Sequence, residues 1–426
     1  MSEGLSLSTR SPSAETPPAT GPRVIFINRY FAPDISATSQ MLSELCFALA
    51  PRGFRVVVLT SRSAYDAPAT SLPPRETLQG VDVHRVWTTR FGRGSLAGRA
   101  CDYLSFYLSA LVALLLLARR GDVVVAKTDP PLVSVVAAVV AGIKGARLVN
   151  WLQDVFPEVA LRLGVLAPGA LARSLRRLRN WSLGRARRNV VIGERMAALL
   201  VAEGVAREAI EVIPNWADGA LIAPVAPADN PLRAAWGYAN SLVVGYSGNL
   251  GRAHEFDTLL GAAERLANEA DIAFLFIGGG RGNQQLRAAV EARGLRNLQF
   301  QPYQAPALLA QSLSVPDVHL VSLLPAMEGL IVPSKIYGIA AAGRPCIFIG
   351  DPAGEVAGLL AAGGFGLTVA PGDSEALAAA ILGLREDAPE RHRLGQQARA
   401  FFDQGGSMQE AAARWDVLLR EDLARA

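Results

Sequence analysis

The sequence predicts two consecutive α/β lobes of the Rossmann-like, doubly wound kind, facing a central cleft. The chain has 426 residues, too many for one ordinary core but suited to two lobes of roughly 200 residues each. Short β-branched runs alternate with helical patterns, which predicts right-handed crossovers and parallel sheets. Half of the residues are hydrophobic and 19% are charged, which is typical of a globular protein and not of a polytopic membrane protein.

The first lobe is predicted over 23–216, after a tail over 1–22. The tail is rich in Ser, Thr, Pro and Ala and has no apolar stretch for a signal peptide, so we expect it to be disordered. The expected strands of the lobe are 24–28, 56–61, 122–127, 147–152, 190–192 and 211–214, and the expected helices are 39–52, 103–119 and 131–143. Pro214-Asn215-Trp216 and a Pro- and Ala-rich stretch to residue 231 predict a hinge.

The second lobe, predicted over 217–405, restarts the alternation. Its expected strands are 241–247, 272–277, 298–301, 318–322 and 345–349, with a helix over 255–269. Ligands of open α/β sheets bind beyond the carboxyl ends of the strands, so two such lobes predict a cleft lined by both sets of strand ends. The last segment, 406–426, is expected to form a helix that packs back on the first lobe.

Charge and cysteine content indicate where the protein acts. Seven arginines lie between residues 173 and 188, and no acid occurs from 159 to 193. Such a basic helix fits an anionic membrane surface, with Arg173, Arg176 and Arg177 facing it, or else is an ordinary solvated face. Only Trp181 interleaves the arginines, which argues against nucleic acid. Three widely spaced cysteines fit a reducing cytoplasm.

The longest uncharged apolar run covers residues 103–118. Its 16 residues are fewer than the roughly 20 that a bilayer crossing needs, so we expect a buried or interfacial helix. Together with the arginines, it predicts a cytoplasmic protein docked peripherally on the inner face of the plasma membrane.

The strongest local signal is the run EGLIVPSKIYGIAAAGRP, which begins at Glu328. It places a carboxylate, a proline turn and Ser-Lys ahead of a helix of small residues, just after a strand. A helix that opens there directs its N–H groups and positive dipole end at a phosphate. Glu328 is then free to accept sugar hydroxyls; the alternative is a solvated loop acid.

With this run, the chain resembles glycosyltransferase family 4, whose members have the GT-B fold. The resemblance covers about residues 23–402 and is closest to the branch that assembles bacterial polysaccharides, including fucosamine and colanic acid glycosyltransferases. The other segments that carry it, in order, are RYFAPDISATSQ, WLQDVFPE, VIPNWAD, YSGNLGRAHEFDTLL and FIGGGRG. It implies retaining transfer of a sugar from a nucleotide diphosphate donor to a saccharide acceptor, lipid-linked in this branch, without a metal or other cofactor.

The resemblance assigns donor contacts in the Glu328 run. Family members carry two glutamates separated by seven residues, the first touching the donor sugar and the second the ribose. Glu328 matches the first. Ile336, or Gly338 in a second alignment, stands where the second is expected. Lys335 or Ser334 can substitute there, so Pro333, Ser334 and Lys335 are assigned to donor binding.

The segment SGNLGRAHEF follows the first strand of the second lobe, where a glycine turn lets cations approach a diphosphate. Relatives place Arg and Lys where this chain has Asn249 and His254. Arg252 is therefore our choice for the pyrophosphate, against an ordinary surface arginine. The remaining donor contacts are predicted at Asn249, Gly251 and His254, at Gly279, where the nucleotide can lie against the backbone, and at Tyr303, beside the base.

Two segments of the first lobe are predicted to line the acceptor side. Asp154 follows a strand where relatives have His-Asp, so it either contacts the sugar or acceptor or caps a helix that starts at Val155. Glu158 is a similar candidate. Pro33, Asp34 and Ser36 lie after the first strand and either line the site or simply cap the next helix.

The chemistry predicted from these residues depends on placed charges. With four histidines, no Ser-His-Asp triad and no metal motif in the sequence, Glu328, Asp154 and Arg252 form the proposed catalytic set. Arg252 and helix amides stabilise the leaving diphosphate while the sugar gains oxocarbenium character. Two alternatives stay open. One is a nucleotide-sugar 2-epimerase, and the other is a catalytically silent sugar-binding protein at the membrane surface.

Overall fold

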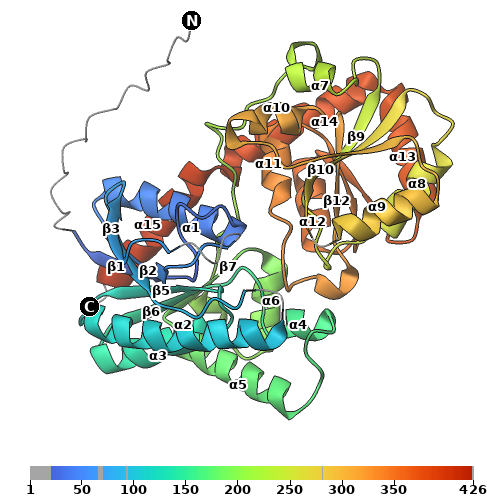
Figure 1. Cartoon of the computed structure of the whole chain (residues 1–426). Helices are drawn as coiled ribbons and strands as arrows, with labels where there is room; N and C mark the ends of the chain where they lie inside the picture. The colour runs from blue at the N-terminus through green and yellow to red at the C-terminus, as the bar shows by residue number, and fades with distance from the viewer. Residues whose placement is uncertain (1–20, 66–70, 93–94, 281, 425–426) are drawn as a thin grey trace, which may run out of the picture.

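The computed structural model describes residues 21–65, 71–92, 95–280 and 282–424, so most of the predicted tail lies outside the described residues. Two α/β lobes face each other (Figure 1). The first sheet has eight strands in the order β3-β4-β2-β1-β5-β6-β7-β8, and the second has six in the order β11-β10-β9-β12-β13-β14. The predicted fold class, two doubly wound lobes, is confirmed.

The first lobe contains eight strands and six helices among the described residues. The strands are β1 (Arg23–Ile27), β2 (Arg55–Ser61), β3 (Arg75–Leu78), β4 (Val81–Val86), β5 (Val123–Lys127), β6 (Arg147–Trp151), β7 (Arg188–Val191) and β8 (Ile210–Val212). The helices are α1 (Ala37–Leu49), α2 (Leu96–Leu117), α3 (Val133–Lys144), α4 (Glu158–Arg162), α5 (Ala170–Arg185) and α6 (Glu194–Ala202).

The sequence did not reveal the hairpin of β3 and β4, the antiparallel pair at the edge of this otherwise parallel sheet. Gln79 and Gly80 connect the two strands and both have positive φ, as a two-residue hairpin turn requires. β3 has only four residues and no fully buried side chain, so its pattern is too weak to predict a strand.

The second lobe has its own sheet and helices. The strands are β9 (Leu242–Asn249), β10 (Ile272–Gly279), β11 (Leu298–Gln301), β12 (Val318–Ser322), β13 (Cys346–Ile349) and β14 (Gly366–Val369). The helices are α7 (Pro231–Ala235), α8 (Asp257–Arg265), α9 (Asn283–Ala292), α10 (Leu309–Ser314), α11 (Lys335–Ala341), α12 (Glu355–Gly363), α13 (Ser374–Glu386) and α14 (Ala388–Phe401). β9 lies between β10 and β12, so the strand order reverses at β9, where such sheets bind ligands.

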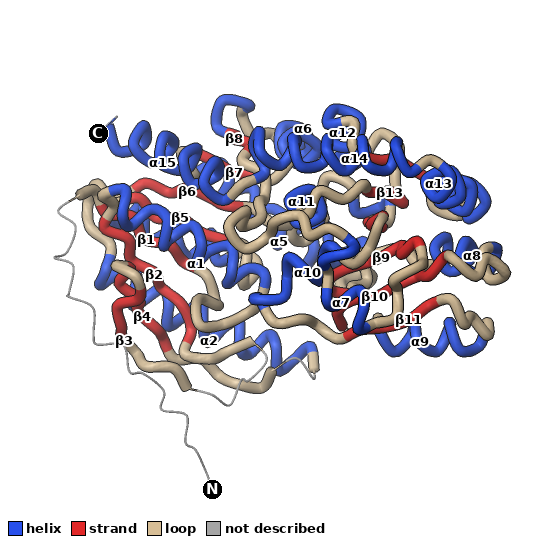
Figure 2. Tube along the Cα trace, turned by 90° about the horizontal axis from the view of Figure 1, so that it is seen from above, coloured by secondary structure: helices blue, strands red, loops and turns tan. Residues whose placement is uncertain are grey.

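The last helix, α15 (Met408–Ala424), packs on the first lobe, beside α1 (Figures 1 and 2). Trp415 of α15 is buried against Trp151 of β6, with ring centroids 5.0 Å apart. The chain therefore crosses between the lobes twice. The crossings lie side by side, because the Ala217 N–H donates to the Gly406 carbonyl at 3.0 Å.

The apolar helix of the first lobe is longer than the sequence indicated. α2 has 22 residues, starting at Leu96 and not at residue 103 as predicted, and it meets the length and hydropathy of a membrane-spanning helix. The uncharged run does not include the first turns of α2, because Arg99 and Asp102 lie in those turns. Phe106, Ala110 and Leu114 are fully buried in a cluster with strands β1, β2 and β5, so α2 is a layer of the first lobe.

Candidate active site

The two lobes touch at the loops that follow β6 and β12. Asp154 of the first lobe forms an isolated β-bridge with Ile331 of the second, and the Val155 N–H donates to the Leu330 carbonyl at 3.0 Å. These loops carry Asp154 and Glu328, two members of the predicted catalytic set. The fold thus brings both segments to one place between the lobes.

Asp154 is not a helix cap. α4 begins at Glu158 and its N-cap residue is Pro157, so the helix-capping alternative was wrong. Burial, together with the neighbouring Asp129 carboxylate, raises the pKa of Asp154 to about 7, although a hydrogen bond with Thr128 acts in the opposite direction. Its Oδ1 atom is buried without a partner among the described residues. Such a carboxyl can exchange a proton near neutral pH.

Lys127, at the end of β5, is a cleft residue that the sequence analysis missed. Its Nζ atom donates to the Thr38 carbonyl at 3.0 Å and lies 4.0 Å from the centre of the Trp151 ring. Burial lowers its pKa to about 7. The sequence does contain a signal for this residue, because Lys127 is one of only three lysines and ends an otherwise apolar strand.

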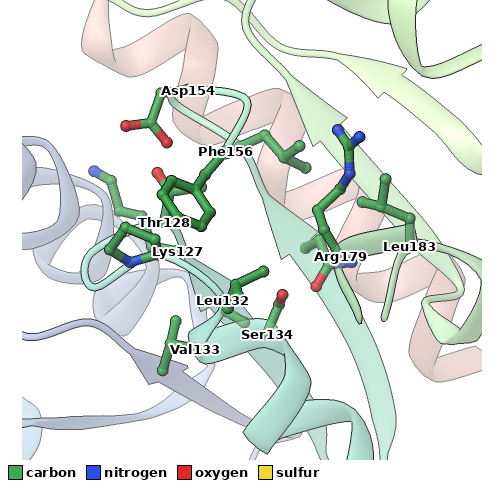
Figure 3. Close-up of a pocket in the computed structure, with 13 residues that line it drawn as sticks. Lys127, Thr128, Leu132, Val133, Ser134, Asp154, Phe156, Arg179 and Leu183 are labelled. Carbon is green, nitrogen blue, oxygen red and sulfur yellow. The ribbon is translucent and has the colours of Figure 1, made fainter. Parts of the chain in front are cut away.

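A small cavity of about 30 Å³ lies beside these groups. Figure 3 shows Asp154, Thr128 and Lys127 on one side of it and Arg179 and Leu183 on the other. Its volume suits a water molecule or two, not a sugar.

The loop after β1 uses its polar groups internally. Asp34 accepts hydrogen bonds from the Ser36 backbone at 2.9 Å, from the Ser36 hydroxyl, and from the Tyr65 N–H at 2.5 Å. Ser36 is the N-cap residue of α1, and Pro33 is exposed in the same loop. Both side chains therefore hold the loop that leads into α1, and their acceptor-side assignment stays a prediction.

Glu158 also has hydrogen-bond partners within the first lobe. Its Oε1 atom accepts from Arg176 at 2.7 Å and from Arg179 at 3.0 Å, which fastens α4 to α5. The Oε2 atom of Glu158 is buried without a partner among the described residues, so its acceptor-side role stays a prediction. Arg176 is exposed although it donates to Glu158, so its membrane-facing role also stays a prediction. Arg173 and Arg177 are exposed on α5.

Glu328 follows the 3₁₀ turn Pro325–Met327 after β12. Its Oε2 atom accepts from the Glu355 N–H at 3.1 Å, so the carboxylate caps α12. Its Oε1 atom has no partner in the part of the chain that the structure describes. Burial raises the pKa of Glu328. One oxygen is thus fixed by the fold, and the other is buried close to Gly354 without a partner among the described residues.

Two cations lie at the carboxyl end of β9. Arg252 is exposed, and its side chain forms no hydrogen bond or ion pair with a described residue. The buried Nζ of Lys335 lies 3.6 Å from the centre of the Tyr246 ring, below Gly248, without a hydrogen-bond partner among the described residues. Burial lowers the pKa of Lys335 to about 7. Asn249, Gly251 and Ser334 belong to the same two loops, and Pro333 is buried beneath them.

His254 stands where the resemblance places a cation, and its ring is uncharged in this structure. Its Nδ1 atom donates to the Ser322 carbonyl at 2.7 Å, because a carbonyl can only accept. Burial, together with the Lys335 ammonium, lowers its pKa to about 4, although the hydrogen bond to Ser322 acts in the opposite direction, so the ring is neutral at pH 7. Nε2 then presents a lone pair, which suits a hydroxyl, and the predicted donor contact of His254 stays a prediction.

The glycines at the end of β10 serve the packing of the protein itself. A Cβ atom on Gly278 would lie 2.3 Å from the Gly248 carbonyl oxygen, and one on Gly279 would lie 3.1 Å from the Tyr303 ring. The Gly279 backbone therefore lies against the Tyr303 ring, and its predicted contact with the nucleotide stays a prediction. The Tyr303 side chain is 60% exposed, and its ring lies close to Gly279.

No group of three or more His, Cys, Asp or Glu side chains suited to a metal ion occurs among the described residues. The three cysteines are unpaired, with Cys46 and Cys346 buried and Cys101 exposed.

Each of the two lobes matches a known protein family. Residues 37–216 match the glycosyl transferase 4-like domain, and residues 241–387 match the glycosyl transferases group 1 domain. The chain is 32% identical over 265 residues to the probable glycosyltransferase WbjE of Pseudomonas aeruginosa, covering 62% of this chain and 66% of that one. It is 31% identical over 247 residues to the putative colanic acid biosynthesis glycosyl transferase WcaI of Escherichia coli, covering 57% and 60%. The matched region thus spans less than two thirds of each relative.

Solved structures share the fold at low identity. Sucrose-phosphate synthase from Thermosynechococcus elongatus superposes with a TM-score of 0.76 at 17% identity, covering 95% of this chain and 100% of that one. HepE of Anabaena, in complex with UDP and glucose, gives 0.72 at 18%, covering 94% and 99%. WaaG, a glycosyltransferase involved in lipopolysaccharide biosynthesis, gives 0.66 at 15%, covering 92% and 99%. With both lobes matched in order over more than half of its length, the chain belongs to glycosyltransferase family 4 of the GT-B fold.

Proposed function

We propose that this protein is a retaining glycosyltransferase that moves a sugar from a nucleotide diphosphate donor to a lipid-linked saccharide in bacterial cell-surface polysaccharide biosynthesis. The observation that carries the proposal is the set of unpaired groups at the strand ends of the second lobe. The Nζ atom of Lys335 and one oxygen of Glu328 are buried without a partner among the described residues, Arg252 is exposed in the loop after β9, and the Asp154 loop of the first lobe touches the Glu328 loop. The matched relatives are glycosyltransferases, and HepE binds UDP and glucose on the same fold.

The proposed chemistry assigns one task to each group. Arg252 and Lys335 hold the donor diphosphate and stabilise the charge that develops as it leaves. The free oxygen of Glu328 accepts a hydroxyl of the transferred sugar and stabilises its oxocarbenium character. Asp154 lies on the acceptor side, where its pKa of about 7 suits a hydrogen bond to the attacking hydroxyl. The acceptor proton passes to the departing phosphate, which lets the new bond form on the face that the diphosphate leaves.

Metal independence is part of this proposal, because two cationic side chains supply the charge at the diphosphate. Turnover that survives a chelator supports it, and turnover that a chelator abolishes and Mg²⁺ or Mn²⁺ restores would overturn it.

The membrane part of the proposal rests on the outer face of α2, α3 and α5. Leu104, Leu108, Val112 and Leu116 form an exposed ridge on α2 at four-residue spacing, and each is more than half exposed. Exposed apolar residues continue on the neighbouring helices, at Val139 and Ile143 of α3 and at Leu171, Leu178 and Trp181 of α5. The one acid in these three helices, Asp102, is buried. An apolar ridge flanked by Arg173 and Arg177 fits an anionic bilayer surface.

Transfer is tested with the purified chain, radiolabelled UDP-, GDP- and dTDP-sugars, and a lipid extract from a strain whose polysaccharide stops at the acceptor. Label that moves to the lipid fraction, and fails to do so with Glu328→Gln, supports the proposal. Sugar isomerisation without acceptor would identify an epimerase. Donor binding without either reaction would identify a silent binding protein.

Membrane docking is tested by sedimentation with vesicles of phosphatidylcholine alone or with phosphatidylglycerol. We expect binding only to the anionic vesicles, and weaker binding for Arg173→Ala/Arg177→Ala and for Leu108→Ser/Leu116→Ser. Arg296→Ala, an exposed arginine ahead of β11, is the matched control. Binding that is equal for all these proteins would contradict this part.

A further inference from the structure

Two helices from different lobes meet end to end beside the cleft, and neither is capped by its own N-cap side chain. α6 of the first lobe begins after Gly193, and α12 of the second begins after Gly354. Helix starts leave N–H groups unpaired and carry a partial positive charge, so each needs an acceptor, best an anionic one.

Carboxylates from elsewhere in the chain fill both positions. Glu328 accepts the Glu355 N–H at 3.1 Å and so caps α12. The Glu355 carboxylate in turn accepts the N–H groups of Glu194 at 3.2 Å and of Arg195 at 2.7 Å, and so caps α6. The candidate catalytic carboxylate is thus linked to the first lobe through one helix start and one side chain.

The two glycines make these contacts possible. A Cβ atom on Gly354 would lie 2.3 Å from the Glu328 Oε1 atom, and one on Gly193 would lie 2.5 Å from the carboxylate carbon of Glu355. Any other residue at either position would displace the carboxylate. This close fit indicates that the two caps are built features of the junction and not incidental surface contacts.

The junction is exposed to solvent, so it can open and re-form. A groove of about 310 Å³ lies along it, lined by residues of α6 and of the start of α12. Arg195 adds a second link between the lobes by donating to the Ala353 carbonyl. Separation of the lobes would remove both links and leave the start of α12, with Glu328, without its support from the first lobe.

We propose that Glu355 is a positioning residue that couples closure of the lobes to the orientation of Glu328. This inference rests on the proposed function of Glu328 as a donor-sugar contact. With the lobes closed, Glu355 fixes α12 against α6, and α12 fixes one oxygen of Glu328 so that the other faces the sugar. With the lobes open, donor still binds through Arg252 and Lys335 of the second lobe, but Glu328 is not held for turnover.

The test compares Glu355→Ala, Glu355→Gln and Gly193→Ala with the wild type. Gly193→Ala is the sharpest variant, because its methyl group displaces the cap while Glu355 itself remains. Glu194→Ala is the matched control at the same junction, since its side chain is exposed and pairs only with Arg207. For each protein we would measure the melting temperature, the donor Kd, kcat, and the radius of gyration with saturating donor.

We expect Glu355→Ala and Gly193→Ala to lower kcat about tenfold or more while the donor Kd changes less than about threefold. Glu355→Gln keeps one acceptor oxygen and should fall between them and the wild type. The first two variants should also have a larger radius of gyration, whereas Glu194→Ala should match the wild type in every measurement.

Three results separate the outcomes. Unchanged kcat and radius of gyration in both Glu355→Ala and Gly193→Ala would overturn the inference. A donor Kd that weakens in step with kcat would also overturn it, because the residue would then support the donor site itself. If the wild type transfers no sugar, the proposed function fails, and the radius of gyration still decides whether Glu355 holds the lobes together.

Discussion

The polar loops that face the cleft from the two lobes differ in how their side chains are satisfied. In the first lobe, Asp34 gives both carboxylate oxygens to groups of the same lobe. Glu158 gives its Oε1 atom to two arginines, while its Oε2 atom, like the Oδ1 atom of Asp154, is buried without a partner among the described residues. In the second lobe, the Nζ atom of Lys335 and one oxygen of Glu328 are buried without a partner among the described residues, and Arg252 is exposed. A polar group left unpaired in a buried place costs stability, so its persistence indicates a ligand. In the proposed function, the cations of the second lobe therefore bind the donor diphosphate, whereas the unpaired carboxyl oxygens of Asp154 and Glu158 in the first lobe suit hydroxyl groups.

The largest effect is expected at Glu328. Glu328→Gln keeps the size of the side chain but removes the charge opposite the developing oxocarbenium ion, so kcat should fall roughly 100-fold. Glu375→Gln, at an exposed glutamate of α13, is the control and should keep wild-type kcat. A kcat within twofold of the wild type for Glu328→Gln would remove Glu328 from the catalytic set.

The second-largest effect is expected at Arg252. Arg252→Ala removes a charged donor from the diphosphate, and donor Kd should rise about tenfold, equivalent to roughly 1.4 kcal/mol. Calorimetric titration measures it, with Arg296→Ala as an exposed arginine ahead of β11, away from the strand ends that form the cleft. Equal Kd values for the two variants would place the diphosphate elsewhere.

Donor binding is expected to depend on pH because the Lys335 amine titrates. Its pKa in the free protein is about 7, and a bound diphosphate favours the charged amine and raises that pKa. Below pH 7 the amine is already charged and affinity is flat. Above pH 7 binding must take up a proton, so donor affinity should fall by up to about tenfold per pH unit. Lys335→Met should bind more weakly and lose this slope; a slope that persists in the variant would assign it to another group.

The smallest effect on binding is expected in the first lobe. Asp34→Ala removes the acceptor of two backbone N–H groups, so thermal or denaturant unfolding should show a loss of about 1–3 kcal/mol. Donor Kd should stay within twofold of the wild type. A weakened Kd without a loss of stability would return Asp34 to the ligand site and break the contrast between the lobes.

The sequence was sufficient for the fold because strand and helix periodicities are local. It placed β11 and β12 at their observed bounds, while it missed the β3–β4 hairpin, whose strands are short and lie at the sheet edge. The positions of Arg252, Lys335 and Glu328 at strand ends also followed from the alternation of elements.

What the sequence could not show is which polar side chains already have partners. Glu158 and Arg176 are 18 residues apart, and only the fold of α4 onto α5 makes them an ion pair. The neutral state of His254 likewise depends on the Ser322 carbonyl, which lies 68 residues away in the chain. The approach of the Tyr303 ring to Gly279 also depends on the fold, because the ring comes from the loop after β11.

The most direct test of the donor site is thermal unfolding of the wild type and of Arg252→Ala/Lys335→Met with a panel of UDP-, GDP- and dTDP-sugars. The proposal predicts that one sugar nucleotide, at about 100 times its Kd, stabilises the wild type by about 2.7 kcal/mol and the double variant by far less. Absence of stabilisation by every member of the panel, or equal stabilisation of both proteins, would contradict a donor site built on these two cations.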